Sequence, residues 1–189
     1  MEADWEVEMG ADAPVIDALW PGLVDLRSNP ERIAEIEETR RLPALAEALL
    51  RLNRSDSGSP VWTAKCDFWA LGSDPDLDPG SARWDPDEMD ATAPESMAAV
   101  ACYIDMLPVD AAAFAGLDQA QPWATGLVDR LRQIVGRCRR VDLVIRRAFQ
   151  GDMEGLGVTA YATACGADSA AAEQALSRTL LGLANAICT

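Results

Sequence analysis

Side chains suited to acid–base or nucleophilic chemistry occupy alternate positions of four strand-like segments. They are Thr63, Lys65, Asp67, Tyr103, Asp105, Arg140, Asp142, Arg146, Thr159 and Tyr161. Residues two apart on a strand point to the same side, so these groups converge on one face if the strands pair. Asp67 and Asp105 would then serve as acid and base, with Arg140 or Arg146 binding an anionic group. The alternative is a solvated or interface face, where alternating polar residues are ordinary.

Lys65 is the only lysine of the chain and lies between Thr63 and Asp67. A lysine shielded from water can be a Schiff-base nucleophile, whereas the ordinary alternative is an ion pair with Asp67 or Asp105. We expect the ion pair and assign no catalytic residue. The candidate ligand or interface residues are Lys65, Asp67, Tyr103, Asp105, Arg140, Arg146 and Tyr161.

Composition excludes several kinds of site and partner. Histidine is absent, so triads built on it and the commonest metal ligand are missing. The five cysteines stand singly without a CxxC pair, which argues against a zinc site and a disulfide framework. We therefore expect no metal and no cofactor, and we expect Cys165 to be a buried structural thiol.

The charge balance also limits the partners. With 31 acidic and 16 basic side chains, the net charge of −15 disfavours nucleic acid and anionic membranes. The sequence has no stretch of about 20 apolar residues and no secretion signal at its start, so we expect a cytoplasmic protein.

An acidic connection over residues 73–95 resembles the opening of a calcium loop. Its carboxylates at alternate positions are Asp74, Asp76 and Asp78. The match is incomplete because Gly80 comes one residue late and the twelfth position is Asp85 rather than the usual Glu. A solvated loop is the favoured interpretation, and calcium binding stays open. Trp69, before this loop, and Trp84, within it, could mark an interaction patch.

Basic residues concentrate between positions 130 and 147. They are Arg130, Arg132, Arg137, Arg139, Arg140, Arg146 and Arg147. The cluster could bind phosphate, carboxylate or an acidic partner. We favour neutralisation within the molecule, by the acidic loop or by the face carrying Glu35, Glu37 and Glu38.

Residues 1–60 are expected to be mainly helical and to pack on the rest of the chain. Apolar spacing predicts a helix over 11–27, kinked at Pro21 and Gly22. Asn29 and Pro30 predict the start of a second helix, which continues to Arg40, and a third covers 43–53. Before them, alternation from Trp5 to Met9 allows one extra edge strand.

From residue 61 the period changes to two, and the elements read strand, strand, helix, repeated once. The predicted strands cover 61–71, 97–107, 139–148 and 155–165, with helices over 121–136 and after Asp168. This ββαββα order is a circular permutation of the ferredoxin-like arrangement. It predicts an α+β domain over 61–189 with a four-stranded antiparallel sheet and both helices on one face, following the helical amino-terminal segment.

These patterns favour a non-catalytic binding or assembly protein. It would act through the polar sheet face or the Trp-flanked acidic loop on a protein partner or a second copy of itself. The alternative is a small cofactor-independent enzyme or ligand sensor with a pocket on that face, which would accept a small anionic ligand. An enclosed cavity between the amino-terminal helices and the sheet would distinguish the two.

Overall fold

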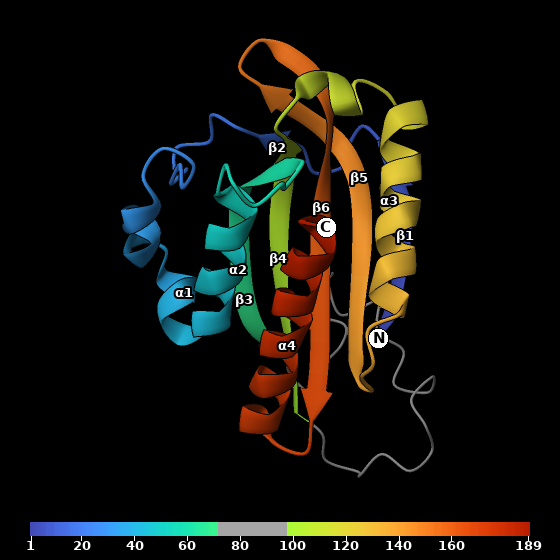
Figure 1. The fold of residues 1–189 in the computed structure, drawn as a ribbon. Helices are drawn as coiled ribbons and strands as arrows, with labels where there is room; N and C mark the ends of the chain where they lie inside the picture. Colours follow the sequence, from blue (N-terminus) through green and yellow to red (C-terminus); the bar gives the residue numbers. More distant parts are fainter. Residues whose placement is uncertain (72–97) are drawn as a thin grey trace.

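A mixed six-stranded sheet, covered on one face by helices, organises the chain in the computed structural model (Figure 1). The structure describes residues 1–71 and 98–189. The strands are β1 (Glu2–Glu8), β2 (Ile16–Asp17), β3 (Val61–Leu71), β4 (Ala98–Pro108), β5 (Arg139–Gln150) and β6 (Met153–Gly166). The helices are η1 (Pro30–Glu35), α1 (Glu37–Arg41), α2 (Pro43–Asn53), η5 (Ala111–Phe114), α3 (Leu117–Arg132) and α4 (Ser169–Ile187). The strand order is β1-β5-β6-β4-β3, and β2 also pairs with β5.

The predicted four-stranded antiparallel sheet is wrong. Strands β3 to β6 are present near their expected positions and pair antiparallel, but β1 and β2 both add parallel pairs to β5. Glu2 lies opposite Arg140 and Ile16 lies opposite Ala148. The amino-terminal segment therefore begins with a strand rather than a helix, as the alternation around Trp5 had allowed.

The first predicted helix is also wrong. Residues 11–27 form turns and the short strand β2. The second predicted helix is divided into η1 and α1 because Ile36 between them is extended, with φ −82° and ψ 108°. The third is confirmed as α2, which begins at Pro43, where the missing N–H costs no helical hydrogen bond. Helix α3 begins at Leu117, before the predicted start, and contains Pro122.

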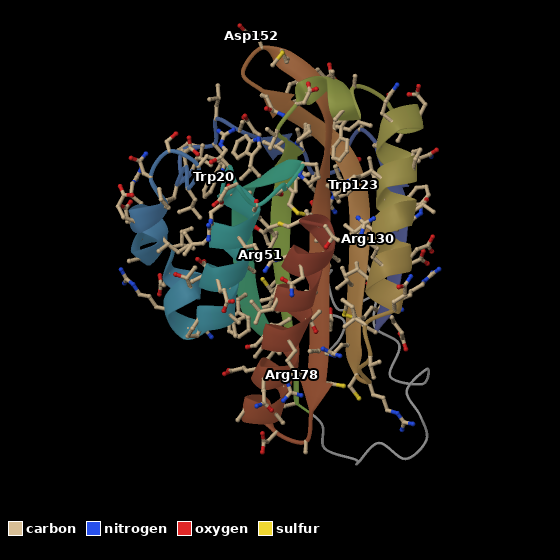
Figure 2. The ribbon with its side chains drawn as sticks, in the orientation of Figure 1. Trp20, Arg51, Trp123, Arg130, Asp152 and Arg178 are labelled. Carbon is tan, nitrogen blue, oxygen red and sulfur yellow. The ribbon has the colours of Figure 1, made fainter. Side chains whose placement is uncertain are left out.

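The main core lies between the sheet and the helices α2, α3 and α4 (Figure 1). Fully buried members include Leu45, Leu49, Leu127, Leu131, Leu143, Leu176 and Leu180. The predicted cap of the last helix is confirmed, because the Ala171 N–H donates to the Asp168 carboxylate at 2.8 Å. Figure 2 shows Arg51, Arg130 and Arg178 on the helices of this layer. Among the described residues, no helix is long and apolar enough to span a membrane.

A β-bulge in β3 changes which side chains reach each face. Thr63 pairs with Met106 and Lys65 pairs with Asp105, so Ala64 is an extra residue. Thr63 consequently faces α2, where its hydroxyl accepts a hydrogen bond from Asn53 Nδ2 at 2.6 Å. The expectation that Thr63 shares a face with Lys65 is wrong, because the bulge shifts the alternation by one residue.

Candidate functional site on the polar face of the sheet

The face opposite the helices carries rows of side chains that cross the sheet from β1 to β3. We call it the polar face. One row is Glu6, Val144, Thr159, Asp105 and Lys65; the next is Asp4, Asp142, Tyr161, Tyr103 and Asp67; the third is Glu2, Arg140, Thr163, Ala101 and Trp69. Their neighbours along each strand, such as Val158 and Ala160, lie in the main core. All seven predicted site residues thus share this face. Arg146 lies in the adjacent row, between Glu8 and Gly157.

A hydrogen-bonded chain runs across the polar face through Arg146. Its Nε and Nη2 donate to Glu8 Oε2 at 3.0 and 2.6 Å, and its Nη1 donates to Thr159 Oγ1 at 2.9 Å and Tyr161 Oη at 3.1 Å. The Thr159 hydroxyl in turn donates to Asp105 Oδ1 at 2.6 Å. The Arg146 side chain is only 7% exposed, so these contacts hold a charge that has left water.

Burial changes the pKa values of the groups in and beside this hydrogen-bonded network. Burial raises the pKa of Asp105, although the Thr159 hydroxyl and the charges of Arg146 and Lys65 oppose it. Burial also raises the pKa of Tyr103, and the nearby charges of Asp105 and Asp67 add to the rise. Burial lowers the pKa of Arg146, but hydrogen bonds from Arg146 to Glu8 and Tyr161 outweigh this and raise it overall. Tyr103 is therefore a neutral phenol rather than a ready source of phenolate.

Three aromatic rings form a diagonal on the polar face. The Tyr103 ring centroid lies 6.1 Å from that of Trp69 and 6.1 Å from that of Tyr161. The three side chains are half-buried. Lys65 Nζ lies 5.8 Å from the Tyr103 ring centroid and 5.6 Å from that of Trp20, at cation–π distance. The face therefore presents flat aromatic surface beside charged groups.

The two carboxylates proposed as acid and base stand in different surroundings. Asp105 is held by Thr159, whereas Asp67 is exposed and accepts the N–H of Phe68 at 2.7 Å. Asp105 lies opposite Lys65 in register, and the lysine charge lowers its pKa, but the expected ion pair is not observed among the described residues. Arg140 lies on β5, two strands away from Tyr103 on β4, and its Nε lies 2.8 Å from Asp142 Oδ2. The different surroundings of the two carboxylates do not support the hypothesis that Asp67 and Asp105 act together as acid and base.

Residues 1–60 do not place their helices over the polar face. Helix α2 contributes Leu45 and Leu49 to the main core on the opposite side, so it does not form the helical roof that a pocket on the polar face would require. The segment around β2 covers one end of the polar face instead, where Ile16, Ala18, Trp62, Leu107 and Ala148 form a second, smaller apolar cluster. Gly157 permits this approach, because an added Cβ would lie 3.0 Å from the Ile16 side chain.

A cleft of about 260 Å³ lies beside β3, at the edge of the sheet. It is lined by Trp20, Gly22, Val24, Glu35, Ile36, Glu37, Glu38, Leu49, Thr63, Ala64, Lys65 and Cys66. Trp20 Nε1 donates to the Ala64 carbonyl at 2.7 Å, which fixes the indole over the bulge (Figure 2). Burial, with the charge of Glu38, raises the pKa of the Cys66 thiol to about 12. Of the predicted site residues, Lys65 alone lines this cleft.

The arginine cluster finds partners within the chain. Arg130 Nε donates to the Ala186 carbonyl and Arg132 Nε to the Ala3 carbonyl, both at 2.9 Å. Arg147 pairs with Glu154 at 2.7 Å. Of the expected acidic partners within the described residues, Glu35 instead bonds Arg32. The acidic loop over 73–95, its calcium hypothesis and Trp84 lie outside the described residues.

Glu8 and Trp69 are two residues of the polar face that the predicted site does not include. Glu8 reaches Arg146 only because β1 pairs with β5, and no local pattern reports that pairing. Trp69 lies two residues after Asp67 on the same strand, so the alternation of the sequence already predicted that the two share a face. Over residues 1–71 and 98–189, no group of three His, Cys, Asp or Glu side chains could hold a metal ion.

No protein-family model, curated protein or solved structure matches this chain, so its function rests on the geometry described above.

Proposed function

We propose that this chain is a non-catalytic binding protein whose polar face receives a positively charged segment of a partner protein. The observation that carries the proposal is the diagonal of half-buried rings, Trp69, Tyr103 and Tyr161, set among acidic groups. Aromatic faces attract ammonium and guanidinium groups, and aromatic residues are enriched at the centres of protein interfaces.

The hydrogen bonding of the polar face favours recognition over catalysis. Arg146 is engaged by Glu8 and Thr159, and Arg140 is engaged by Asp142. A general base or nucleophile must be accessible to its substrate, whereas these groups already bind one another. Prearranged side chains lower the ordering cost of association, which suits a surface that docks a partner without doing chemistry on it.

The charge of the polar face favours a cationic partner over a second copy of the chain. Its acidic residues, Glu2, Asp4, Glu6, Glu8, Asp67, Asp105 and Asp142, outnumber its basic residues, Lys65, Arg140 and Arg146. Two such faces docked on each other would oppose like charges, which costs affinity. We therefore expect a monomer in sedimentation equilibrium. If the chain instead self-associates, and Tyr103→Ala abolishes this, the partner of the polar face is a second copy of the chain.

Fluorescence anisotropy of labelled peptides tests the proposal. A peptide of alternating Arg and Ser should bind, and an equally long peptide of Glu and Ser should not. Tyr103→Ala should weaken binding about tenfold through loss of the aromatic centre. Asp67→Asn should weaken it a few-fold, while Asp152→Asn, the same charge change at the exposed tip of the β5–β6 hairpin (Figure 2), should have no effect. Equal binding by all variants would mean that only net charge attracts the peptide.

A small-molecule sensor is the second candidate, and the cleft beside β3 is the observation that favours it. Its apolar wall, formed by Trp20, Ile36 and Leu49, adjoins the carboxylates of Glu37 and Glu38 as well as the ammonium of Lys65, a combination that suits a small apolar amine. Native mass spectrometry of the chain with tryptamine as a probe should then show one bound molecule, lost in Glu38→Gln. Retention of the probe by Glu38→Gln would reject this cleft as the site.

A further inference from the structure

Cys138 and Cys165 face each other at the open end of the β5–β6 hairpin. The register that pairs Arg139 with Ala164 brings these two cysteines opposite each other at its next step. The Cys165 N–H donates to the Cys138 carbonyl at 3.0 Å, and the Cys165 thiol donates to the same oxygen at 3.8 Å. Directly opposed residues of an antiparallel pair have Cβ atoms about 4.5–5.5 Å apart, close to the separation of about 3.5–4.5 Å in a disulfide.

The surroundings of the two thiols are unequal. Cys138 is exposed, whereas Cys165 is only 4% exposed. Burial, a hydrogen bond between the two side chains and the charge of Cys138 raise the pKa of the Cys165 thiol. Cys138 has a φ of 54°, in the left-handed region that a β-carbon disfavours, and stands between Arg137 and Arg139. A disulfide or thiol in solution therefore reaches the Cys138 sulfur before that of Cys165.

We propose that Cys138 and Cys165 form a modification site, which closes to an intramolecular disulfide by exchange with an anionic low-molecular-weight disulfide such as oxidised glutathione. The neighbouring Arg137 and Arg139 attract the carboxylates of such an oxidant. The site is independent of binding at the polar face. It also lies beside that face, since Cys138 and Cys165 continue the rows one step beyond Arg140 and Thr163.

The exchange balances in two steps. The Cys138 thiolate attacks one sulfur of the oxidant, whose S–S bond breaks, and the departing thiolate takes up the proton that Cys138 released. Cys165 then loses its proton and attacks the Cys138 sulfur of the mixed disulfide, expelling the second thiol. Both protein thiols are thereby oxidised, and the oxidant disulfide is reduced to two thiols.

The remaining cysteines do not share this arrangement. Cys102 is fully buried and lies opposite Phe68 and Ala162 in register, not opposite a cysteine. Cys66 faces the helices and lies opposite Ile104. The Cys188 thiol, half-buried at the end of α4, donates to the Arg51 carbonyl at 3.9 Å. Cys188 is thus the partly accessible control.

Peptide mapping of the full chain tests the site. The reduced protein is incubated with oxidised glutathione, alkylated, and digested without reduction. We expect an intact mass lower by two hydrogen atoms and a linked peptide pair joining Cys138 to Cys165. Cys165→Ser should instead retain one glutathione on Cys138, and Cys138→Ser should leave Cys165 unmodified. Cys188→Ser should close as the wild type does.

Three results would overturn the proposal: wild-type protein that keeps glutathione on Cys138 beside an alkylated Cys165, cross-links through other cysteines as the main product, or no reaction at Cys138. Because Cys138 is exposed, Cys138→Ser should fold even if substitution of buried Cys165 does not. The comparison of Cys138→Ser with wild type alone then decides whether Cys138 is the entry point.

Discussion

Replacing Arg146 by leucine should destabilise the protein far more than the same change at the adjacent Arg147. Arg146 is 7% exposed and donates four hydrogen bonds, two to Glu8 and one each to Thr159 and Tyr161. Removing one member of a buried charge pair costs about 3–5 kcal/mol, because its partners stay behind without compensation. Arg147 is 45% exposed and pairs with an exposed glutamate, an interaction worth about 0–1 kcal/mol.

The magnitude at Arg146 depends on which partners can return to water. Glu8 is 39% exposed and can be solvated again, so its two hydrogen bonds contribute the smaller part. Thr159 is fully buried, and Asp105 loses a charge that lowers its pKa, so the larger cost falls on these two. Glu8→Gln alone should therefore cost about 1 kcal/mol or less.

Urea unfolding followed by circular dichroism measures these differences, with free energies obtained by linear extrapolation. We expect Arg146→Leu to lose about 3–5 kcal/mol and Arg147→Leu to lose about 0–1 kcal/mol. If the two variants differ by less than about 1 kcal/mol, Arg146 is not the centre of a buried network. If Arg146→Leu fails to fold, Arg146→Lys, which keeps the charge but has fewer hydrogen-bond donors, should fold and should still be less stable than Arg147→Leu.

Three further outcomes follow from local contacts. Asp168→Ala should cost about 1 kcal/mol of unfolding free energy through loss of the α4 cap, while Asp152→Ala at an exposed turn should cost less than about 0.5 kcal/mol; equal losses would refute the cap. Because the pKa of Asp105 is raised by burial, its contribution to stability is complete below about pH 4 and is lost as pH rises through the folded-state pKa. The stability of wild type minus that of Asp105→Asn, from urea titrations at several pH values, should therefore fall toward neutral pH, and a rise would contradict this sign. Gly22→Ala should displace the Trp20 ring, which an added Cβ would overlap, and cost about 1 kcal/mol with a red shift of tryptophan emission; an unchanged spectrum would show that the ring is not held there.

Local patterns predicted the elements whose determinants are themselves local. Helix α2 follows from Pro43 and its leucine spacing, and α4 follows from the Asp168 cap. The strands β5 and β6 follow from alternation around the turn at Gly151, whose φ is 64°. The shared face of Lys65 and Tyr103 was available from the same alternation.

Long-range pairing and single-residue irregularities could not be predicted in this way. Apolar spacing from Val15 to Leu26 fits a helical period, yet Ile16 is buried against the far face of the sheet, and that burial overrides the local preference. The bulge at Ala64 moves Thr63 to the other face without altering the alternating composition. The parallel β1–β5 pair, and with it the Glu8–Arg146 contact, joins residues 138 positions apart.

The opposition of Cys138 and Cys165 was within reach of the sequence. Both lie equally far from the Gly151–Asp152 turn, so counting outward along the two arms of the hairpin pairs them. Their solitary positions in the chain concealed this relation, because a search for closely spaced cysteines examines neighbours in sequence and not neighbours across strands.

The separation between β1 and its partner has a consequence for synthesis. Chain growth of about 5–20 residues per second places roughly 7–28 s between the completion of β1 and that of β5. Throughout that interval Trp5 and Val7 have no β5 to pair with, and the ladder closes only after a long loop is brought together. The pairing of β1 at the edge of the sheet is thus a late step in folding, and β1 is the segment that a chaperone would shield until β5 is made.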